Sequence, residues 1–163
     1  MARAVPEGSS RVGGPPDRLL GAAIADDLGF LIAAARARTA IEANSVLAPL
    51  GLKVREFSLL WVVSEDLRPS QRELAEFLAL DPSQVVSILD DLERRRLVVR
   101  EQDARDRRSR IIIATDRGRD LIQRALLEVR SASERTLGDL DASEQSMLRD
   151  LLSRVAFRGS VGR

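Results

Sequence analysis

Short polar side chains follow Asp81-Pro82 near the middle of the chain, and their chemistry suits contact with DNA bases. Gln84 carries an amide that can form two hydrogen bonds with adenine, and Ser83 and Ser87 can donate to or accept from several bases. Val86 stands between them and could contact a thymine methyl group. Alone, these residues are also consistent with a solvated helix face, so their meaning depends on the elements around them.

Arginines are concentrated between residues 94 and 110, although the whole chain carries a formal net charge of +1. The stretch holds eight arginines and three acidic residues, which gives it a local charge of +5. Such a cluster on a nearly neutral chain indicates a polyanion partner at one place. Two other readings stay open. Residues 94–96 could be a solvated helix end that complements the helix dipole. Arg107 and Arg108 could form loop ion pairs with Asp103 and Asp106.

The composition removes most catalytic chemistry. The chain has no cysteine, histidine or tyrosine, and Lys53 is its single lysine. Thiolate nucleophiles, histidine bases and Cys or His metal sites are therefore excluded. Carboxylate pairs such as Asp90/Asp91 and Asp26/Asp27 are neighbours on a helix and point in different directions, so they do not form a hydrolase site. We predict a protein that is not an enzyme and has no cofactor or metal.

The elements around these residues form a predicted helix-turn-helix. Ser70 and Glu73 make a capping box for a helix over 71–78, and Asp81 and Pro82 suit the cap and first position of the next helix, over 82–95. The free N–H groups at both helix starts can bind phosphate. A preceding helix is predicted over 55–66. The side chains expected to face the core are Phe57, Leu60, Trp61 and Val63, then Leu74, Ala75 and either Phe77 or Leu78, then Val85, Leu89 and Leu92. The residues of this region that are also expected to contact DNA are Ser70, Gln71, Arg72 and Pro82, of which Ser70 and Gln71 mainly position the backbone.

A β-hairpin is predicted directly after the helix-turn-helix. Residues 97–100 and 111–113 have the pattern of two strands, and the charged loop 103–108 joins them. An arginine-rich hairpin tip suits the narrow minor groove of DNA. A helix-turn-helix followed at once by a basic hairpin is much more specific than either piece, and it predicts a winged helix-turn-helix that binds double-stranded DNA.

Helical segments flank this region on both sides. Residues 1–18 are rich in Pro, Gly and Ser and predict a flexible arm, and apolar residues at helical spacing predict one long helix over 19–47. A fifth helix is expected after Thr115, and a sixth after a capping box at Asp141 and Glu144. We therefore expect a mainly α, six-helix, dimeric fold with a small β-hairpin wing. The expected domains are an arm (1–18), a dimerisation region (19–50 and 119–158) and a winged helix-turn-helix (51–118). No signal peptide or apolar run of membrane-spanning length is present, so a cytoplasmic protein without a membrane partner is expected.

The chain resembles the multiple-antibiotic-resistance regulator (MarR) family of bacterial transcription factors over residues 19–155. The most specific part is the wing, which is similar to the family's Asp-x-Arg-Asp-x-Arg signature and is followed by its Thr-x-x-Gly helix start. The matching stretches are Leu47–Leu52, Gln71–Ala75, Leu89–Glu93, Leu97–Arg100, Asp103–Arg108 and Thr115–Gly118.

This resemblance implies a homodimer that binds a pseudo-palindromic operator, usually to repress transcription. It implies that Arg108 enters the minor groove and that Asp106 holds the guanidinium in position, with Arg105 and Arg107 beside them. Many family members respond to small aromatic or phenolic ligands, so a small aromatic or anionic effector is an expected partner. Its pocket would be lined by Phe30, Phe57 and Trp61, which as plain core residues would need no ligand.

Three residues depart from the family pattern. Lys53 stands where many members have a capping Thr, so the cap must be lost or supplied elsewhere. Arg96 stands where Gly is frequent, which predicts a left-handed arginine at a cost of about 1 kcal/mol. Ala114 replaces an apolar Leu. None of the three removes an expected DNA contact, but a winged helix that binds another protein instead of DNA remains the alternative.

Overall fold

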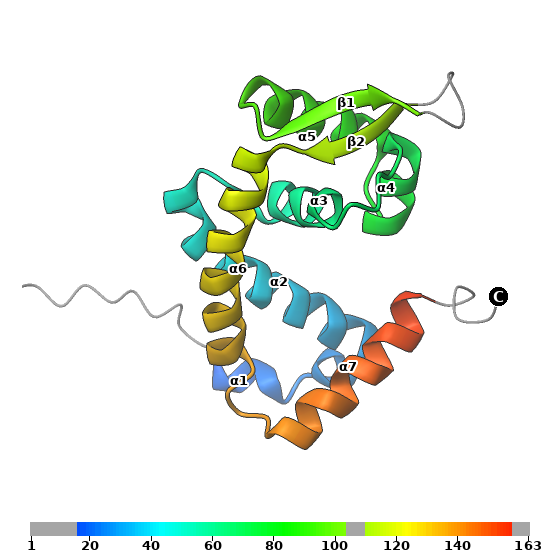
Figure 1. The fold of residues 1–163 in the computed structure, drawn as a ribbon. Helices are drawn as coiled ribbons and strands as arrows, with labels where there is room; N and C mark the ends of the chain where they lie inside the picture. The colour runs from blue at the N-terminus through cyan, green and yellow to red at the C-terminus, as the bar shows by residue number, and fades with distance from the viewer. Residues whose placement is uncertain (1–15, 104–109, 158–163) are drawn as a thin grey trace, which may run out of the picture. The chain divides into compact units, whose positions relative to one another are not determined.

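The computed structural model describes residues 16–103 and 110–157, which form helices and one β-hairpin (Figure 1). The chain divides into two compact units, Met1–Ala37 and Arg38–Arg163, and each is described by itself. Within the described residues there are seven α-helices where six were expected, because the first predicted helix is broken into two. None of the helices in this part of the chain combines the length and apolar content that a membrane span requires.

The first unit corrects the prediction of one helix over 19–47. It contains α1 (Asp17–Leu20), a short 3-10 helix η1 (Ala23–Asp26) and the start of α2 (Leu28–Leu47). The backbone is extended at Asp27, whose carboxylate accepts a hydrogen bond from the N–H of Phe30 at 2.7 Å. Asp27 therefore acts as a helix cap and starts a new helix, because a capping carboxylate satisfies an otherwise free N–H.

The core of the second unit is built around α3 (Val54–Ser64). This helix packs against α4 (Gln71–Leu78), α5 (Pro82–Arg94), β2 (Arg110–Ala114) and α6 (Asp116–Thr136). Contact on several sides buries two neighbouring residues, Leu59 and Leu60, which no single amphipathic stripe would predict. Trp61 was expected to face inward but is 40% exposed, because it lies at the edge of this buried arc beside a cavity. The predicted core residues that are buried are Phe57, Leu60, Val63, Leu74, Ala75, Val85, Leu89 and Leu92.

The predicted helix caps are confirmed. The Ser70 hydroxyl accepts a hydrogen bond from the Glu73 N–H at 3.3 Å, and Asp81 accepts one from the Ser83 N–H at 2.8 Å. Thr115 caps α6, and Asp141 caps α7 (Ala142–Ala156). These caps set where α4, α5, α6 and α7 begin, because they satisfy donors that the helix itself leaves free.

The cap that Lys53 cannot provide is supplied by α2. The side-chain oxygen of Asn44 accepts a hydrogen bond from the Val54 N–H at 3.0 Å, and Glu56 accepts one from the Lys53 N–H at 3.0 Å. A protonated amine has no lone pair for an N–H donor, so these two acceptors replace the missing side-chain cap. The capping group therefore comes from a residue ten positions away.

The hairpin consists of β1 (Val98–Gln102) and β2, which pair antiparallel from Val98 opposite Ala114 to Gln102 opposite Arg110. The Ile112 N–H donates to the carbonyl of Pro69 at 2.9 Å, and Ser70 forms a β-bridge with Ile111. These bonds hold the hairpin against the segment that leads into α4. Figure 1 shows β1 and β2 side by side, with α5 next to β1 and α4 next to β2.

Two backbone positions explain features of the sequence around the hairpin. Arg96 has a φ of 59°, which confirms the expected left-handed arginine after α5. Gly118 lies so close to the carbonyl oxygen of Leu97 that an added Cβ would be 2.1 Å from it. Glycine is therefore needed at this position by a close backbone approach, and the Thr-x-x-Gly pattern is explained by packing as well as by capping.

Candidate nucleic-acid interface and an adjacent cavity

The start of α5 presents the residues expected to contact bases. Ser83, Gln84, Val86 and Ser87 are all exposed, on the side opposite the buried residues of the same helix. The Gln84 side chain makes no hydrogen bond with any residue in the described ranges. It is therefore free to bond with an external partner.

Ser83 is already engaged within the protein. Its hydroxyl and its N–H both donate to Oδ1 of Asp81, the helix cap. These bonds, from the hydroxyl first and the N–H second, lower the pKa of Asp81 below its ordinary value. Because the Ser83 hydroxyl donates its hydrogen bond to Asp81, it can only accept a hydrogen bond from another partner. Gln84 and Ser87 are therefore freer than Ser83 to form hydrogen bonds with an external partner.

The start of α4 carries a second set of predicted contacts. The N–H and the hydroxyl of Ser70 each donate to Glu73 at 2.7 Å, and this lowers the pKa of Glu73. Gln71 is half-buried, whereas Arg72 is exposed and forms an ion pair with Glu76 at 2.8 Å. Side chains at this helix start are thus partly occupied, so the free N–H groups of its first turn would be the more available donors to a phosphate.

The tip of the wing falls outside the described residues. Arg105, Asp106, Arg107 and Arg108 all lie in 104–109, so the structure does not test their predicted roles. The described part of the wing is its paired stem, which is joined to Pro69 just before α4. The chain therefore carries the predicted tip on a stem attached to the helix-turn-helix.

Part of the arginine cluster serves the fold. Arg100 forms ion pairs with Asp90, at 2.6 Å, and with Glu93, while its guanidinium side chain is only 12% exposed. Arg94 and Arg95 both pair with Asp91, at 2.5 and 3.2 Å. The local charge of +5 therefore overstates the free positive charge. The spacing of Asp91 to Arg94 and Arg95 could have revealed the helical pairs, but the pairing of Arg100 with α5 could not be read from the chain.

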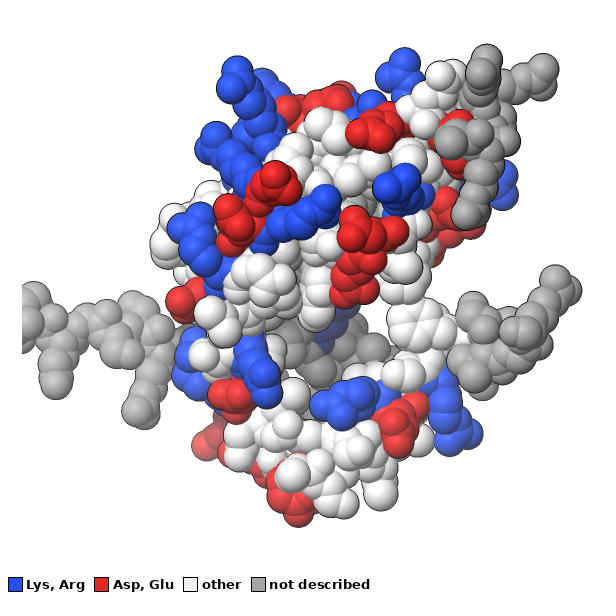
Figure 2. Space-filling view, viewed as in Figure 1, with Lys and Arg blue, Asp and Glu red and all other residues white. Residues whose placement is uncertain are grey.

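The paired arginines Arg94 and Arg95 lie at the C-terminal end of α5. Figure 2 shows basic side chains gathered over the end of α5, with acidic side chains beside them. Partial burial raises the pKa of Asp91, but hydrogen bonds from Arg95 and Arg94 outweigh that effect and lower it overall. The helix-end interpretation of residues 94–96 thus fits Arg94 and Arg95 as partners of α5 carboxylates.

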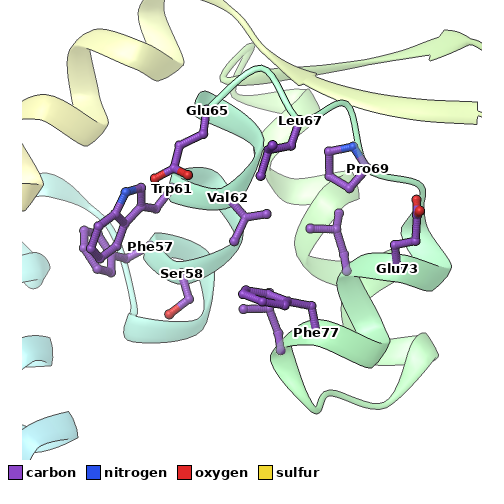
Figure 3. Close-up of a pocket in the computed structure, with 11 residues that line it drawn as sticks. Phe57, Ser58, Trp61, Val62, Glu65, Leu67, Pro69, Glu73 and Phe77 are labelled. Carbon is purple, nitrogen blue, oxygen red and sulfur yellow. The ribbon is translucent and has the colours of Figure 1, made fainter. Parts of the chain in front are cut away.

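A cavity of about 560 Å³ lies between α3 and α4 (Figure 3). Two of the three residues expected to contact an effector, Phe57 and Trp61, line it, and their ring centroids are 5.5 Å apart. Phe57 is 4% exposed, so it belongs to the core and lines the cavity at the same time. The third, Phe30, lies in the first unit and is not among the lining residues. The lining consists of Phe57, Ser58, Trp61, Val62, Glu65, Leu67, Pro69, Glu73, Leu74, Phe77 and Leu78.

The sequence did not single out most of this lining. Leu67 and Pro69 belong to the connection between two helices. Either Phe77 or Leu78 was expected in the core; Phe77 is 58% exposed, and Leu78 is the one that packs against the core. Phe77 stacks on Phe157, at the end of α7, with ring centroids 5.7 Å apart. Exposed aromatic rings on neighbouring helices were the available signal, but their proximity depends on how the helices pack. Within the described residues no group of three or more acidic side chains could hold a metal ion.

The sequence and the fold are similar to those of known transcriptional regulators. The MarR family model matches residues 50–109. The HTH-type transcriptional repressor Mb2911 of Mycobacterium bovis is 34% identical over 134 residues, which cover 81% of this chain and 96% of the repressor. A MarR-family transcriptional regulator from Rhodococcus sp. RHA1 has 35% identity and a TM-score of 0.77, covering 84% of this chain and 99% of its own.

Two further solved structures include bound molecules. CouR from Rhodococcus jostii RHA1, bound to p-coumaroyl-CoA, has 34% identity and a TM-score of 0.76, and the match covers 86% of this chain and 99% of CouR. The Mycobacterium tuberculosis MarR-family protein Rv2887, in complex with DNA, has 31% identity and a TM-score of 0.66, and the match covers 79% of this chain and 97% of Rv2887. With near-complete coverage of relatives at this level of identity, and with the winged helix-turn-helix in place, the chain belongs to the MarR family of transcriptional regulators.

Proposed function

We propose that this protein is a transcriptional regulator that binds a pseudo-palindromic operator as a homodimer and represses transcription. The observation that carries the proposal is the exposed face of α5 at Gln84 and Ser87, which has free polar groups beside a hairpin stem. A helix start of this kind reads bases in the major groove, while a wing contacts the backbone or the minor groove. Repression is supported by the names of the curated relatives, and DNA binding by the Rv2887 complex.

The contacts divide into reading and positioning. Gln84, Ser87 and Val86 would read base edges, since their side chains are exposed and the amide of Gln84 is unengaged. The starts of α4 and α5 would position the DNA backbone through Ser70, Gln71, Arg72, Pro82 and Ser83. Arg105, Arg107 and Arg108 would contact the minor groove or its edges, with Asp106 as the brace of Arg108. Residues 51–118 would form the DNA-binding domain, and 19–50 with 119–158 the dimerisation region.

The dimer is supported by apolar surface that the second unit leaves exposed. Helix α7 has no buried residue, and Met147, Leu151, Leu152 and Val155 are between 42% and 63% exposed. A contiguous apolar helix face of this kind marks an interface. We expect a two-fold symmetric interface larger than about 1,600 Å². A stable monomer at micromolar concentration in sedimentation velocity would contradict this part of the proposal.

A small-molecule effector is proposed for the cavity between α3 and α4. Its volume is in the range of ligand sites, and α4 forms one of its walls, so a bound molecule would contact the helix-turn-helix directly. The complex of CouR with p-coumaroyl-CoA supports ligand binding within this family.

The experiment that tests DNA binding is a selection from random duplexes, followed by titration at two salt concentrations. Enrichment of an inverted repeat, with affinity that falls as salt rises, is the expected result. If no duplex is enriched and binding to DNA is absent at low salt, the alternative of a winged helix that binds another protein is favoured.

A further inference from the structure

We propose that the cavity between α3 and α4 takes an aromatic amine in its cationic form and discriminates against aromatic carboxylates. This inference rests on the effector role proposed above and adds the chemical class of the effector. It is carried by the charge of the lining, because among the described residues Glu65 and Glu73 are the only charged ones that line the cavity, and neither an arginine nor a lysine does.

The two carboxylates lie on different sides of the cavity. Figure 3 shows Glu65 next to Trp61 and Glu73 next to Pro69, with Val62 and Phe77 between them. Neither glutamate forms an ion pair with any residue in the described ranges. A ligand that enters between them meets negative charge that no cation among residues 16–103 and 110–157 compensates at the lining.

The remaining polar groups of the lining are already engaged or ionised. The Ser58 hydroxyl donates to the carbonyl of Val54 at 2.9 Å, within its own helix. Glu73 accepts two hydrogen bonds from Ser70 on its Oε2 atom, which favours its charged form and lowers its pKa. The other oxygen of Glu73 is left as an acceptor. The cavity therefore offers acceptors and negative charge to a ligand.

The apolar part of the lining favours the same class of ligand. Phe57, Trp61 and Phe77 present aromatic rings, and the faces of such rings attract cations as well as other rings. A carboxylate in the same place would lose water, gain no cation and be repelled by both glutamates. A volume of about 560 Å³ admits a ligand with more than one ring.

The position of the cavity connects its occupant to the DNA-binding elements. Glu73, Leu74 and Phe77 lie on α4, the first helix of the helix-turn-helix, and Ser70 at its start is bonded to Glu73. A cation beside Glu73 would contact a group that also caps this helix. The ligand would thus act at the start of α4, where backbone-positioning contacts are proposed.

Trp61 provides a direct measurement, because it is the only tryptophan and the chain has no tyrosine. The probes are three molecules that share a diphenylpropyl skeleton: diphenylpropylamine as the cation, diphenylpropanol as the neutral form and diphenylpropionate as the anion. Each is titrated against the full chain at neutral pH, following Trp61 emission and, independently, heat by calorimetry. We expect the amine to bind best and the propionate at least about tenfold more weakly, since charge is the main difference between them.

Charge-removing variants test the cause of this preference. Glu65→Gln and Glu73→Gln each remove one charge from the cavity, and a glutamine at residue 73 can still complete the capping box. Glu128→Gln is the matched control, because Glu128 is an exposed residue of α6 that does not line the cavity. Each cavity variant should reduce the amine-to-propionate affinity ratio about two- to fivefold, and the control should leave it unchanged. Thermal unfolding of each variant checks that the fold is retained.

The outcomes separate this inference from the proposed function. If the propionate binds as well as the amine, or if the amine-to-propionate affinity ratio is unchanged in both glutamate variants, the proposed preference for cations is wrong, although the cavity is still a ligand site. If none of the three probes binds the parent chain, the cavity is not a ligand site, for example because a second copy of the chain covers it. Operator binding without ligand is measured on the same preparation, and its absence would overturn the proposed function instead.

Discussion

Substitution of Gln84 is the sharpest way to separate sequence-specific recognition of DNA from non-specific DNA binding. The perturbation is Gln84→Ala, which removes the amide and keeps a residue that favours a helix. The amide makes no hydrogen bond with any described residue, so truncation should change stability by less than about 0.5 kcal/mol. The effect should therefore be confined to the complex with DNA.

The expected magnitude follows from the bond that the amide can make. A bidentate contact between Gln and adenine contributes about 1–3 kcal/mol of discrimination, which is about 5- to 150-fold in affinity. The loss should occur at one base pair in each half-site, because a symmetric dimer places one Gln84 in each. Other base pairs should keep their ranking.

Fluorescence anisotropy with the selected operator and with single-base-pair substitutions is the assay. Gln71→Ala is the matched control, since Gln71 is also a glutamine near a helix start but is half-buried on α4 and is expected to contact the backbone. The control should weaken all duplexes to a similar degree. A uniform loss for Gln84→Ala, with the base preference intact, would refute the reasoning and assign Gln84 to phosphate.

Three further predictions concern the wing, the packing beneath it and the effect of acid. Arg108→Ala should weaken operator binding and reduce the slope of log affinity against log salt, because a cation near phosphate is lost. Asp106→Ala should also weaken binding although it removes a negative charge; tighter binding in the same titrations would show that the wing is only a charged patch. Gly118→Ala should destabilise the fold by about 1–3 kcal/mol in urea unfolding, because its Cβ would be 2.1 Å from the Leu97 carbonyl oxygen, and an unchanged midpoint would contradict this contact. The hydrogen bonds from Ser83 lower the pKa of Asp81 in the folded state. The ionised Asp81 carboxylate therefore stabilises the fold above the ordinary Asp pKa of about 4, and this stabilisation is lost as the pH falls through the lower pKa of the folded state. Between pH 6 and pH 3 the thermal midpoint should fall less steeply for Asp81→Asn, which still caps the helix, than for the parent chain. Identical pH profiles for the two proteins would argue against the lowered pKa of Asp81.

The sequence predicted the winged helix-turn-helix because its signals are local. Capping residues lie within three positions of the N–H groups they satisfy, so Ser70, Asp81 and Thr115 could be recognised directly. The period of apolar residues likewise indicated Val85 and Leu89 as the buried side of α5. The break before α2 was also a local signal, at Asp27, but the apolar spacing on either side of it concealed it.

Other features depended on contacts between distant residues. Asn44 replaces the cap that Lys53 cannot provide, and Arg100 pairs with acidic residues of α5. Each of these contacts requires two elements to lie side by side. The amino-acid sequence alone does not specify which acceptor will lie near the Val54 N–H or which carboxylate will lie near Arg100. The free positive charge of the wing region was overestimated for this reason.

The sequence by itself determined the family, the starts of α4, α5, α6 and α7 and the residues of α5 that face solvent, since each follows from residue type and short-range spacing. Only the tertiary structure decided that Gly118 meets the carbonyl of Leu97, and that aromatic rings from α3 and α4 line a cavity whose charged groups, among the described residues, are Glu65 and Glu73. The physical reason is that caps and amphipathic faces act within a few residues along the chain. Cavities, close backbone contacts and compensated charges arise where segments far apart in sequence pack together.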